Sequence, residues 1–290
     1  MNSTRSKIIL GTVQFGLDYG INNSQGRPDP QRVFDILDLA FAQGVRILDS
    51  ADAYGNAPEI IGRYHQSQAE KFDIITKFKS GPHFEAEEWL SQQLGKFGVQ
   101  RLYAAMFHDF QDYQANRSVI SDFEKLVQDG SIGKIGVSIY TNHQLAEAIA
   151  DPSISLIQLP YNLLDNHSQR GELLAKAKAA GKEVHVRSVF LQGLFFVATE
   201  DIPEKLVPLK PELEALGQLA SRFGVPLESM ALNYAVINPH IDHVLIGVDT
   251  PEQLQANLSS LAQTLPPELI ETLDRIKVKD VALLNPTNWK

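Results

Sequence analysis

Cysteine is absent from this chain of 290 residues. Disulfide bonds, thiolate metal sites and cysteine nucleophiles are therefore excluded. Long apolar runs are missing too, since the longest, SVFLQGLFFVA, is too short to cross a bilayer. Basic residues are in deficit, with 26 Lys and Arg against 35 Asp and Glu and a formal net charge of -9. This balance argues against nucleic acids and anionic membranes as partners.

The beginning of the chain, MNSTRSKIIL, becomes polar again too early for a signal peptide. The hydrophobic content of 43% is ordinary and can supply a sizeable core. We therefore expect a soluble, cytoplasmic protein with a small-molecule ligand, without nucleic-acid or membrane partners. The sequence leaves the oligomeric state open.

Strand-like runs alternate with helix-like segments along the whole chain. Residues 28–44 illustrate the helical period, because apolar residues recur on one face before Gly44. A longer helical region is expected over 203–237. The eight strand-like runs lie at 7–13, 45–49, 72–78, 102–108, 132–138, 154–160, 183–190 and 241–248. The pattern predicts an α/β fold, a single-domain (β/α)8 TIM barrel over residues 1–290. A doubly wound parallel sheet is the rival interpretation, because it gives the same alternation.

Common ligand-binding fingerprints are missing or weak. No Gly-x-Gly-x-x-Gly motif opens a helix after the first strand. GSIGKIG at 130–136 is similar to a phosphate loop, but Lys134 lies in a predicted strand and no Ser or Thr follows it. We interpret this segment as a helix cap followed by a strand. His240 and His243 form the only tight histidine pair, at the entrance to a strand, where barrel sites are rare, so we expect no metal site from that pair.

Three ionisable residues stand at the carboxyl ends of successive predicted strands. They are Asp49, Lys77 and His108, about one βα unit apart, and Tyr54 follows Asp49 on the next loop. Each alone has an ordinary explanation, such as a helix cap for the aspartate or a surface position for the lysine. In a barrel, however, the carboxyl ends of the strands form the catalytic face. The order therefore predicts one site that contains all four side chains.

These residues resemble motifs of the aldo-keto reductase family, of the bacterial type with a short carboxyl-terminal tail. The motifs are DSADAYGN, ITKF and MFHD, with GVS at 136–138, QLPYNLLD at 158–165 and IGVDTPEQLQANL at 246–258. The resemblance extends from LGTVQFG to the closing NPTNW. It implies a (β/α)8 barrel that binds a nicotinamide dinucleotide without a Rossmann domain, which agrees with the missing glycine fingerprint.

The resemblance implies an oxidoreductase that reduces an aldehyde, ketone or sugar carbonyl, or oxidises the matching alcohol. Tyr54 would be the general acid and base. Lys77 would lower the pKa of the phenol, which is ordinarily near about 10. Asp49 would hold Lys77, and His108 would orient the carbonyl oxygen, while the cofactor supplies hydride.

The resemblance also implies cofactor contacts. Ser138 and Gln158 would hold the nicotinamide carboxamide, and Arg187 takes the position of the ring that stacks on the nicotinamide. Further contacts, to the ribose, pyrophosphate and adenine, are expected from Gly11, Thr12, Ser188, Val189, Leu191, Gly193, Ile246, Gly247, Val248, Gln253 and Asn257.

Three departures from the family pattern bear on the cofactor. Ile139 replaces an asparagine that usually follows Ser138, and Arg187 replaces an aromatic ring. The guanidinium of Arg187 is planar and can stack, but its charge disfavours the oxidised nicotinamide. Residues 246–258 hold no basic residue and include Asp249, which would repel the 2′-phosphate of NADP. NADP(H) is favoured by the family, with NAD(H) as the alternative.

Other functions and the substrate stay open at this point. The rival function is a cofactor-binding regulatory or interaction subunit with little turnover, like potassium-channel β-subunits. An isomerase or aldolase on the same barrel would use a strand-end lysine or carboxylate without Tyr54. Walls of the substrate pocket are expected from loop residues whose mixture suits a carbonyl compound such as a sugar derivative. These are Gln14, Phe15, Phe78, Phe110, Phe190 and Trp289.

Overall fold

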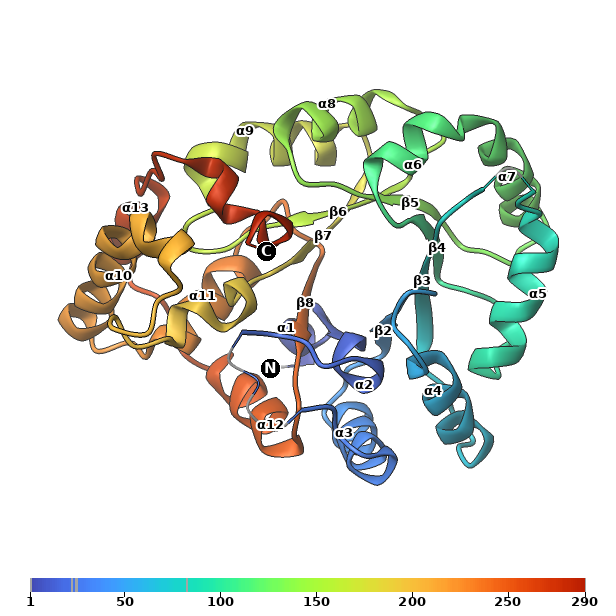
Figure 1. Cartoon of the computed structure of the whole chain (residues 1–290), viewed down its shortest axis with the longest axis horizontal. Coiled ribbons are helices and arrows are strands. Elements are labelled where there is room, and N and C mark those ends of the chain that lie inside the picture. The colour runs from blue at the N-terminus through green and yellow to red at the C-terminus, as the bar shows by residue number, and fades with distance from the viewer. Residues whose placement is uncertain (1, 22, 24–25, 82, 290) are drawn as a thin grey trace.

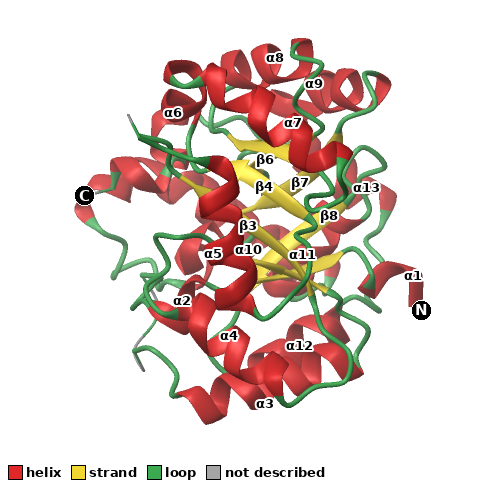
Figure 2. Ribbon diagram, turned by 90° about the vertical axis from the view of Figure 1, so that its right-hand side faces the viewer, coloured by secondary structure: helices red, strands yellow, loops and turns green. Residues whose placement is uncertain are grey.

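The computed structural model describes residues 2–21, 23, 26–81 and 83–289. Eight parallel strands form a closed barrel in chain order, surrounded by helices (Figure 2). The barrel closes where β8 pairs with β1, with Gly11 opposite Gly247. Because a doubly wound sheet would leave two edges unpaired, the closed ring excludes that rival. The strands are β1 (Ile8–Gly11), β2 (Ile47–Asp49), β3 (Asp73–Phe78), β4 (Ala104–Phe107), β5 (Ile135–Ser138), β6 (Leu156–Pro160), β7 (Glu183–Arg187) and β8 (His243–Gly247).

The helices form an outer ring around the strands (Figure 1). The longer helices are α3 (Pro30–Ala42), α4 (Ala57–Gln66), α5 (Ala86–Phe97), α6 (Phe110–Ala115), α7 (Ile120–Gln128), α8 (Asn142–Ala150), α9 (His167–Ala179), α10 (Lys210–Phe223), α11 (Leu227–Val236), α12 (Pro251–Ser260) and α13 (Pro267–Asp274). Shorter turns of helix are α1 (Asn2–Arg5), α2 (Val13–Gly16), η1 (Arg117–Val119), η2 (Leu191–Phe196), η3 (Glu204–Leu209), η4 (Val281–Leu284) and η5 (Pro286–Asn288).

Helix α3 illustrates how the sequence sets the ends of an element. The Asp29 side chain accepts a hydrogen bond from the Arg32 backbone N–H at 3.0 Å, and Pro30 occupies the first helical position. The apolar residues that recur at helical spacing are buried against the barrel. Gly44 then adopts φ +90°, a left-handed conformation that ends the run before β2.

An apolar cluster lies inside the barrel. It consists of Ile9, Ile47, Ile75, Ala104, Met106, Leu156 and Leu245. Because side chains alternate along a strand, residues two positions away also point inward. At the carboxyl end these are polar residues such as Asp49 and Lys77, while at the amino end of β8 the inward residue is His243. Polar side chains thus lie toward both ends of the barrel interior, and Gln158 on β6 pairs in register with His185 on β7.

Some expected elements differ from the observed ones. The helical region expected over 203–237 is divided into η3, α10 and α11, because Gly224 at φ +63° and Pro226 end α10. Helices α6 and α13 were not expected. The strand expected over 183–190 ends at Arg187. Segment 130–136 is a turn after α7 followed by β5, which confirms the interpretation as a helix end and strand rather than a phosphate loop.

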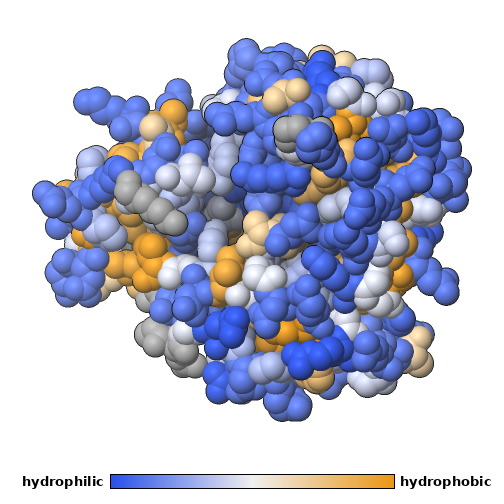
Figure 3. All heavy atoms as spheres, turned by 45° about the vertical axis from the view of Figure 1, so that its right-hand side comes forward, coloured by the Kyte–Doolittle hydropathy of each residue, from blue (hydrophilic) through white to orange (hydrophobic). Residues whose placement is uncertain are grey.

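The outer surface is largely polar. Figure 3 shows a face where hydrophilic side chains predominate and apolar side chains lie in small separate areas. Across the part of the chain that the structure describes, no helix combines the length and apolar character needed to cross a membrane. Three of the exposed large apolar side chains, Leu17, Tyr19 and Ile21, share the loop that follows β1.

Candidate active site

A buried ion pair lies at the carboxyl end of β2 and β3. The Lys77 ammonium donates to Asp49 Oδ1, and Gln158 Nε2 on β6 donates to Asp49 Oδ2 at 2.8 Å. Asp49 and Lys77 are each only 2% exposed. Burial lowers the pKa of Lys77, and the negative charge of Asp49 opposes that change. Both oxygens of the carboxylate thus have donors inside the barrel.

Tyr54 is held above this pair by a tight turn. Its backbone N–H bonds Ala51 O at 3.0 Å, and its carbonyl accepts from the Ala57 N–H at 3.1 Å. Gly55 adopts φ +55°, and a Cβ on Gly16 would lie 1.8 Å from Tyr54 O. Two glycines are therefore required, one for its conformation and one for the close approach of two backbones. This explains why a glycine directly follows the tyrosine.

The structure brings the four predicted side chains together at one end of the barrel. The Lys77 Nζ lies 5.5 Å from the centroid of the Tyr54 ring. The Tyr54 and His108 ring centroids are 6.1 Å apart, with the rings at 89° to one another. His108 directly follows β4, and its backbone N–H bonds Phe78 O at 2.9 Å. A phenol, an imidazole and a buried ammonium–carboxylate pair thus share one mouth.

The protonation of these groups follows from burial. Burial raises the pKa of Tyr54, as does the charge of Asp49, whereas Arg187 lowers it. Burial and Asp49 outweigh the opposing cation, and the expected lowering of the Tyr54 pKa by Lys77 stays a prediction. Burial, with the charges of Lys77 and Lys79, lowers the pKa of His108 to about 4. At neutral pH the phenol is protonated and the imidazole is uncharged.

Arg187 is fixed at the end of β7. Its Nη2 donates to Ile139 O at 3.1 Å, and its Cζ lies 4.2 Å from the centroid of the Tyr140 ring. Tyr140 O in turn accepts from Arg170 at 2.6 Å, and Arg170 forms a buried ion pair with Asp165 at 2.6 Å. Stacking and hydrogen bonding hold the guanidinium in a defined orientation at the mouth.

The loop after β7 has an unusual backbone. Ser188, Leu191 and Gln192 adopt φ +59°, +47° and +55°, a region that non-glycine residues rarely occupy. Asn162 Nδ2 donates to Ser188 O at 3.1 Å and supports this conformation. Gln192 Nε2 donates to the Tyr19 hydroxyl at 2.9 Å, so the loops after β7 and β1 meet beside the mouth. Backbone strain of this kind is concentrated at binding sites.

The residues expected to hold a nicotinamide carboxamide fit that group. Gln158 is fully buried, and its Oε1 has no hydrogen-bond partner within the described residues, although its amide nitrogen is bound to Asp49. Ser138 pairs with Gln158 in register across β5 and β6. An orphaned acceptor next to a hydroxyl matches an amide that both donates and accepts. Gly11 and Gly247, paired across β1 and β8, place no side chain in the mouth.

Other expected cofactor residues differ in what they offer. Val189, Leu191, Ile246 and Val248 are buried and belong to the apolar core. Thr12 is buried and bonds Asp49 O through its hydroxyl at 3.0 Å. The remaining expected cofactor residues lie in two segments. Ser188 and Gly193 belong to the loop after β7, and Gln253 and Asn257 belong to α12.

Asp249 lies at the start of the segment that leads into α12. Asn23 donates to Asp249 Oδ1 at 3.4 Å, and Gln253 Oε1 accepts from the Asp249 N–H at 2.7 Å. Burial raises the pKa of the Asp249 carboxyl. The side chain of Gln253 is thus engaged by the backbone before any ligand binds.

Three of the residues expected as pocket walls, Phe15, Phe78 and Phe110, are buried in the apolar core. Their place in a substrate pocket stays a prediction. Sequence reasoning missed Tyr140, whose ring lies 4.2 Å from the Arg187 guanidinium, and Tyr19. The charges of Tyr54 and Arg187 act on Tyr19, whose pKa burial raises. Their position on loops after β1 and β5 is the signal that could have identified them.

Comparisons with known proteins agree with this geometry. The Aldo/keto reductase family model matches residues 7–278. The chain is 24% identical to the uncharacterized oxidoreductase YrpG of Bacillus subtilis, over 93% of this chain and 92% of that protein. It is 23% identical to the NADH-specific methylglyoxal reductase of Escherichia coli, over 94% of this chain and 97% of that protein.

Solved structures give the same fold. The holo form of an aldo-keto reductase from Bacillus halodurans matches with a TM-score of 0.74 at 20% identity, and the match covers 94% of each chain. The family model extends over nearly the whole barrel, which confirms the family and enzyme class expected from the sequence. The chain therefore belongs to the aldo/keto reductase family and is an NAD(P)-dependent oxidoreductase.

Proposed function

We propose that the protein reduces the carbonyl group of a small aldehyde, ketone or sugar, or oxidises the matching alcohol, with Tyr54 as general acid and base. The observation that carries this proposal is the shared mouth, where Tyr54 stands 6.1 Å from His108 and 5.5 Å from the Lys77 ammonium. A bound nicotinamide cofactor would supply or accept the hydride.

In this scheme Tyr54 gives its phenolic proton to the carbonyl oxygen as that oxygen gains negative charge. The raised pKa of Tyr54 keeps the proton on the phenol throughout the neutral range. Reduction therefore begins from the correct protonation state, whereas alcohol oxidation first requires loss of this proton. We infer that carbonyl reduction is the faster direction at neutral pH.

The neighbouring residues have supporting roles. Neutral His108 donates a hydrogen bond that orients the carbonyl oxygen beside Tyr54. Asp49 holds Lys77 in its charged form under the phenol, where the ammonium stabilises negative charge that develops on the phenolic oxygen. Gln158 Oε1 and the Ser138 hydroxyl would hold the cofactor amide, with the fixed guanidinium of Arg187 against the nicotinamide ring.

Turnover is tested by the loss of reduced-nicotinamide absorbance with NADPH and NADH against a panel of aldehydes, ketones and sugars. Substrate-dependent oxidation of either cofactor supports the proposal. Tight cofactor binding with no turnover on the whole panel, together with a stably associated protein partner, would favour the regulatory-subunit function instead.

Arg187→Tyr is expected to reduce the preference for the reduced cofactor by about tenfold. The guanidinium places a fixed positive charge beside the nicotinamide, and the oxidised ring is itself positive. Removing a unit charge a few ångströms away in a partly buried site changes the free energy by about 1–3 kcal/mol. Fluorescence titration with oxidised and reduced cofactor gives the two dissociation constants for each protein.

Arg117→Tyr is the matched control for this prediction. Arg117 also stacks on a tyrosine, at 4.8 Å from the Tyr113 ring, but belongs to η1. Its replacement should leave the ratio of the two dissociation constants unchanged. An unchanged ratio in Arg187→Tyr would remove the role assigned to this charge.

Asp249→Asn is expected to increase affinity for NADPH relative to NADH by about three- to tenfold. The substitution keeps the side-chain shape and an oxygen for Asn23, but removes a negative charge near the position expected for the 2′-phosphate. The ratio of kcat/KM for the two cofactors measures the change.

Asp129→Asn is the matched control for this prediction. Asp129 lies in the turn that precedes β5, at the other end of the barrel, and its replacement carries the same charge change but should not alter the ratio. Equal ratios in both variants would place the phosphate elsewhere.

A further inference from the structure

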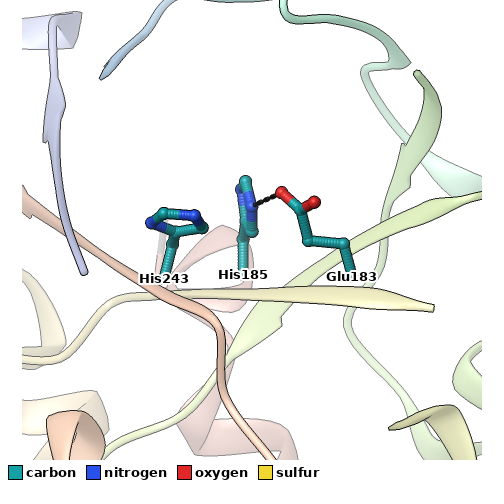
Figure 4. Close-up of side chains that lie close together, drawn as sticks. All are labelled: Glu183, His185 and His243. Atoms are coloured by element: carbon teal, nitrogen blue, oxygen red, sulfur yellow. Dashed lines mark hydrogen bonds and ion pairs between the residues drawn. The ribbon is translucent and has the colours of Figure 1, made fainter. Parts of the chain in front are cut away.

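A second polar cluster lies inside the barrel at the amino end of its strands. Glu183 and His185 belong to β7 and are two residues apart, so they share a face. His243 is the first residue of β8 and pairs in register with His185. Figure 4 shows the three side chains in a row, with His185 in the middle. Topology has thus placed two imidazoles and a carboxylate side by side.

The distances within this cluster are short. His185 Nε2 lies 2.6 Å from Glu183 Oε1, and the His185 and His243 ring centroids are 4.8 Å apart. One potential ligand atom from each of the three residues lies within 4.8 Å of the others. Zinc bonds of about 2.0–2.2 Å hold tetrahedral ligands about 3.3 Å apart. A bound ion would therefore draw the three groups closer together.

Each of the two histidines has one ring nitrogen without a hydrogen bond among the described residues. The Nδ1 atoms of His185 and His243 are both buried, and neither has a hydrogen-bond partner among the described residues. His185 is completely buried. Buried nitrogen atoms without partners are uncommon and point to a missing ligand.

The carboxylate is oriented by two further residues. The Tyr103 hydroxyl donates to Glu183 Oε1 at 2.7 Å, and Lys134 Nζ lies 3.1 Å from Oε2. These contacts hold the carboxylate in one orientation, as the hydrogen-bond partners of metal-ligating carboxylates do.

We propose that Glu183, His185 and His243 bind one divalent transition-metal ion. Two imidazoles and one carboxylate suit Zn²⁺ and its neighbours rather than Mg²⁺ or Ca²⁺, which prefer oxygen ligands. Glu183 and His243 are only partly buried, which gives the ion a path from solvent. The amino end of a barrel contributes to stability rather than catalysis, so the ion fastens β7 to β8. His240 plays no part in this set.

Metal-stripped protein is titrated with Zn²⁺ by calorimetry and with Co²⁺ by visible absorbance. We expect one ion per chain, d–d bands typical of tetrahedral or five-coordinate Co²⁺, and displacement of Co²⁺ by Zn²⁺. At about a hundredfold excess of Zn²⁺ over the dissociation constant, Tm should rise by about 5 °C. The absence of stoichiometric binding at millimolar Zn²⁺ would overturn the proposal and leave a hydrogen-bond network only.

Variants locate the ion. His243→Gln and Glu183→Gln should each weaken Zn²⁺ binding by about 100-fold or more, and either one, checked for native circular dichroism, suffices. His143→Gln is the matched control, since His143 also lies 2.9 Å from a glutamate, Glu147, but on the exposed surface of α8. Binding that survives in the cluster variants and is lost in His143→Gln would assign the ion to the surface and refute the cluster.

Discussion

Replacing Tyr54 by phenylalanine is expected to lower kcat/KM for carbonyl reduction by about 100- to 10,000-fold. The ring and its T-shaped contact with His108 remain, and only the proton donor is lost. Cofactor affinity should change little, because the expected cofactor contacts come from other strands and loops. Steady-state kinetics with the best substrate of the panel, together with cofactor titration, measure the two effects separately.

Tyr64→Phe is the matched control for this experiment. Tyr64 lies on α4, and its hydroxyl donates to Asp38 at 2.8 Å, away from the mouth. Tyr64→Phe removes a phenolic hydroxyl, as Tyr54→Phe does, and should leave kcat/KM within a few-fold of the wild type. If Tyr54→Phe were equally active, another group would have to supply the proton, and the proposed role of Tyr54 would be wrong.

Lys77→Met is expected to reduce the free energy of unfolding by about 3–5 kcal/mol and to abolish most of the activity. Asp49 would stay buried with Gln158 as its remaining side-chain donor, and an uncompensated buried charge is strongly destabilising. Denaturant unfolding measures the stability. Lys182→Met is the comparison, because Lys182 is also buried but donates to the backbone carbonyls of Asp151 and Ile154 rather than to a carboxylate.

The double variant Asp49→Asn, Lys77→Met separates stability from chemistry. With both charges removed, no carboxylate is left unpaired, and part of the lost stability should return. Activity should stay low, because the ammonium beneath Tyr54 is still missing. Recovery of activity together with stability would mean that Lys77 serves only to hold the fold.

The catalytic end of the barrel could be predicted because its signal is local. Asp49, Lys77 and His108 each end an apolar run, and successive parallel strands carry such positions to one face. The Tyr-Gly pair was equally visible as a turn. A prediction of proximity needed only the order of elements and no knowledge of how side chains pack.

Features that depend on tertiary contacts were not predictable in the same way. The strand expected through Phe190 stops at Arg187, because Ser188 takes a left-handed conformation that Asn162 supports from the loop after β6. The cluster at the amino end depends on the register of β7 with β8, which juxtaposes His185 and His243. Attention to the pair within one segment, His240 and His243, missed the pair formed between segments.

The direction in which the pKa of Tyr54 changes could not be predicted from the sequence either. Residue types show that an ammonium and a phenol are neighbours, but not which acid already neutralises that ammonium. In the folded chain Lys77 is paired with Asp49, and a guanidinium from β7 is a second cation that lowers the pKa of the phenol. Such partnerships depend on ångström-scale geometry.

The seven apolar side chains of the cluster inside the barrel come from other strands, so β7 carries polar side chains at both of its ends. Glu183 and Arg187 are four positions apart on β7, about 13 Å of extended chain. The effects of replacing Glu183 and of replacing Arg187 should therefore add without coupling. Evolution or protein design can therefore change metal binding at Glu183 without a change at Arg187, at the catalytic end of the same strand.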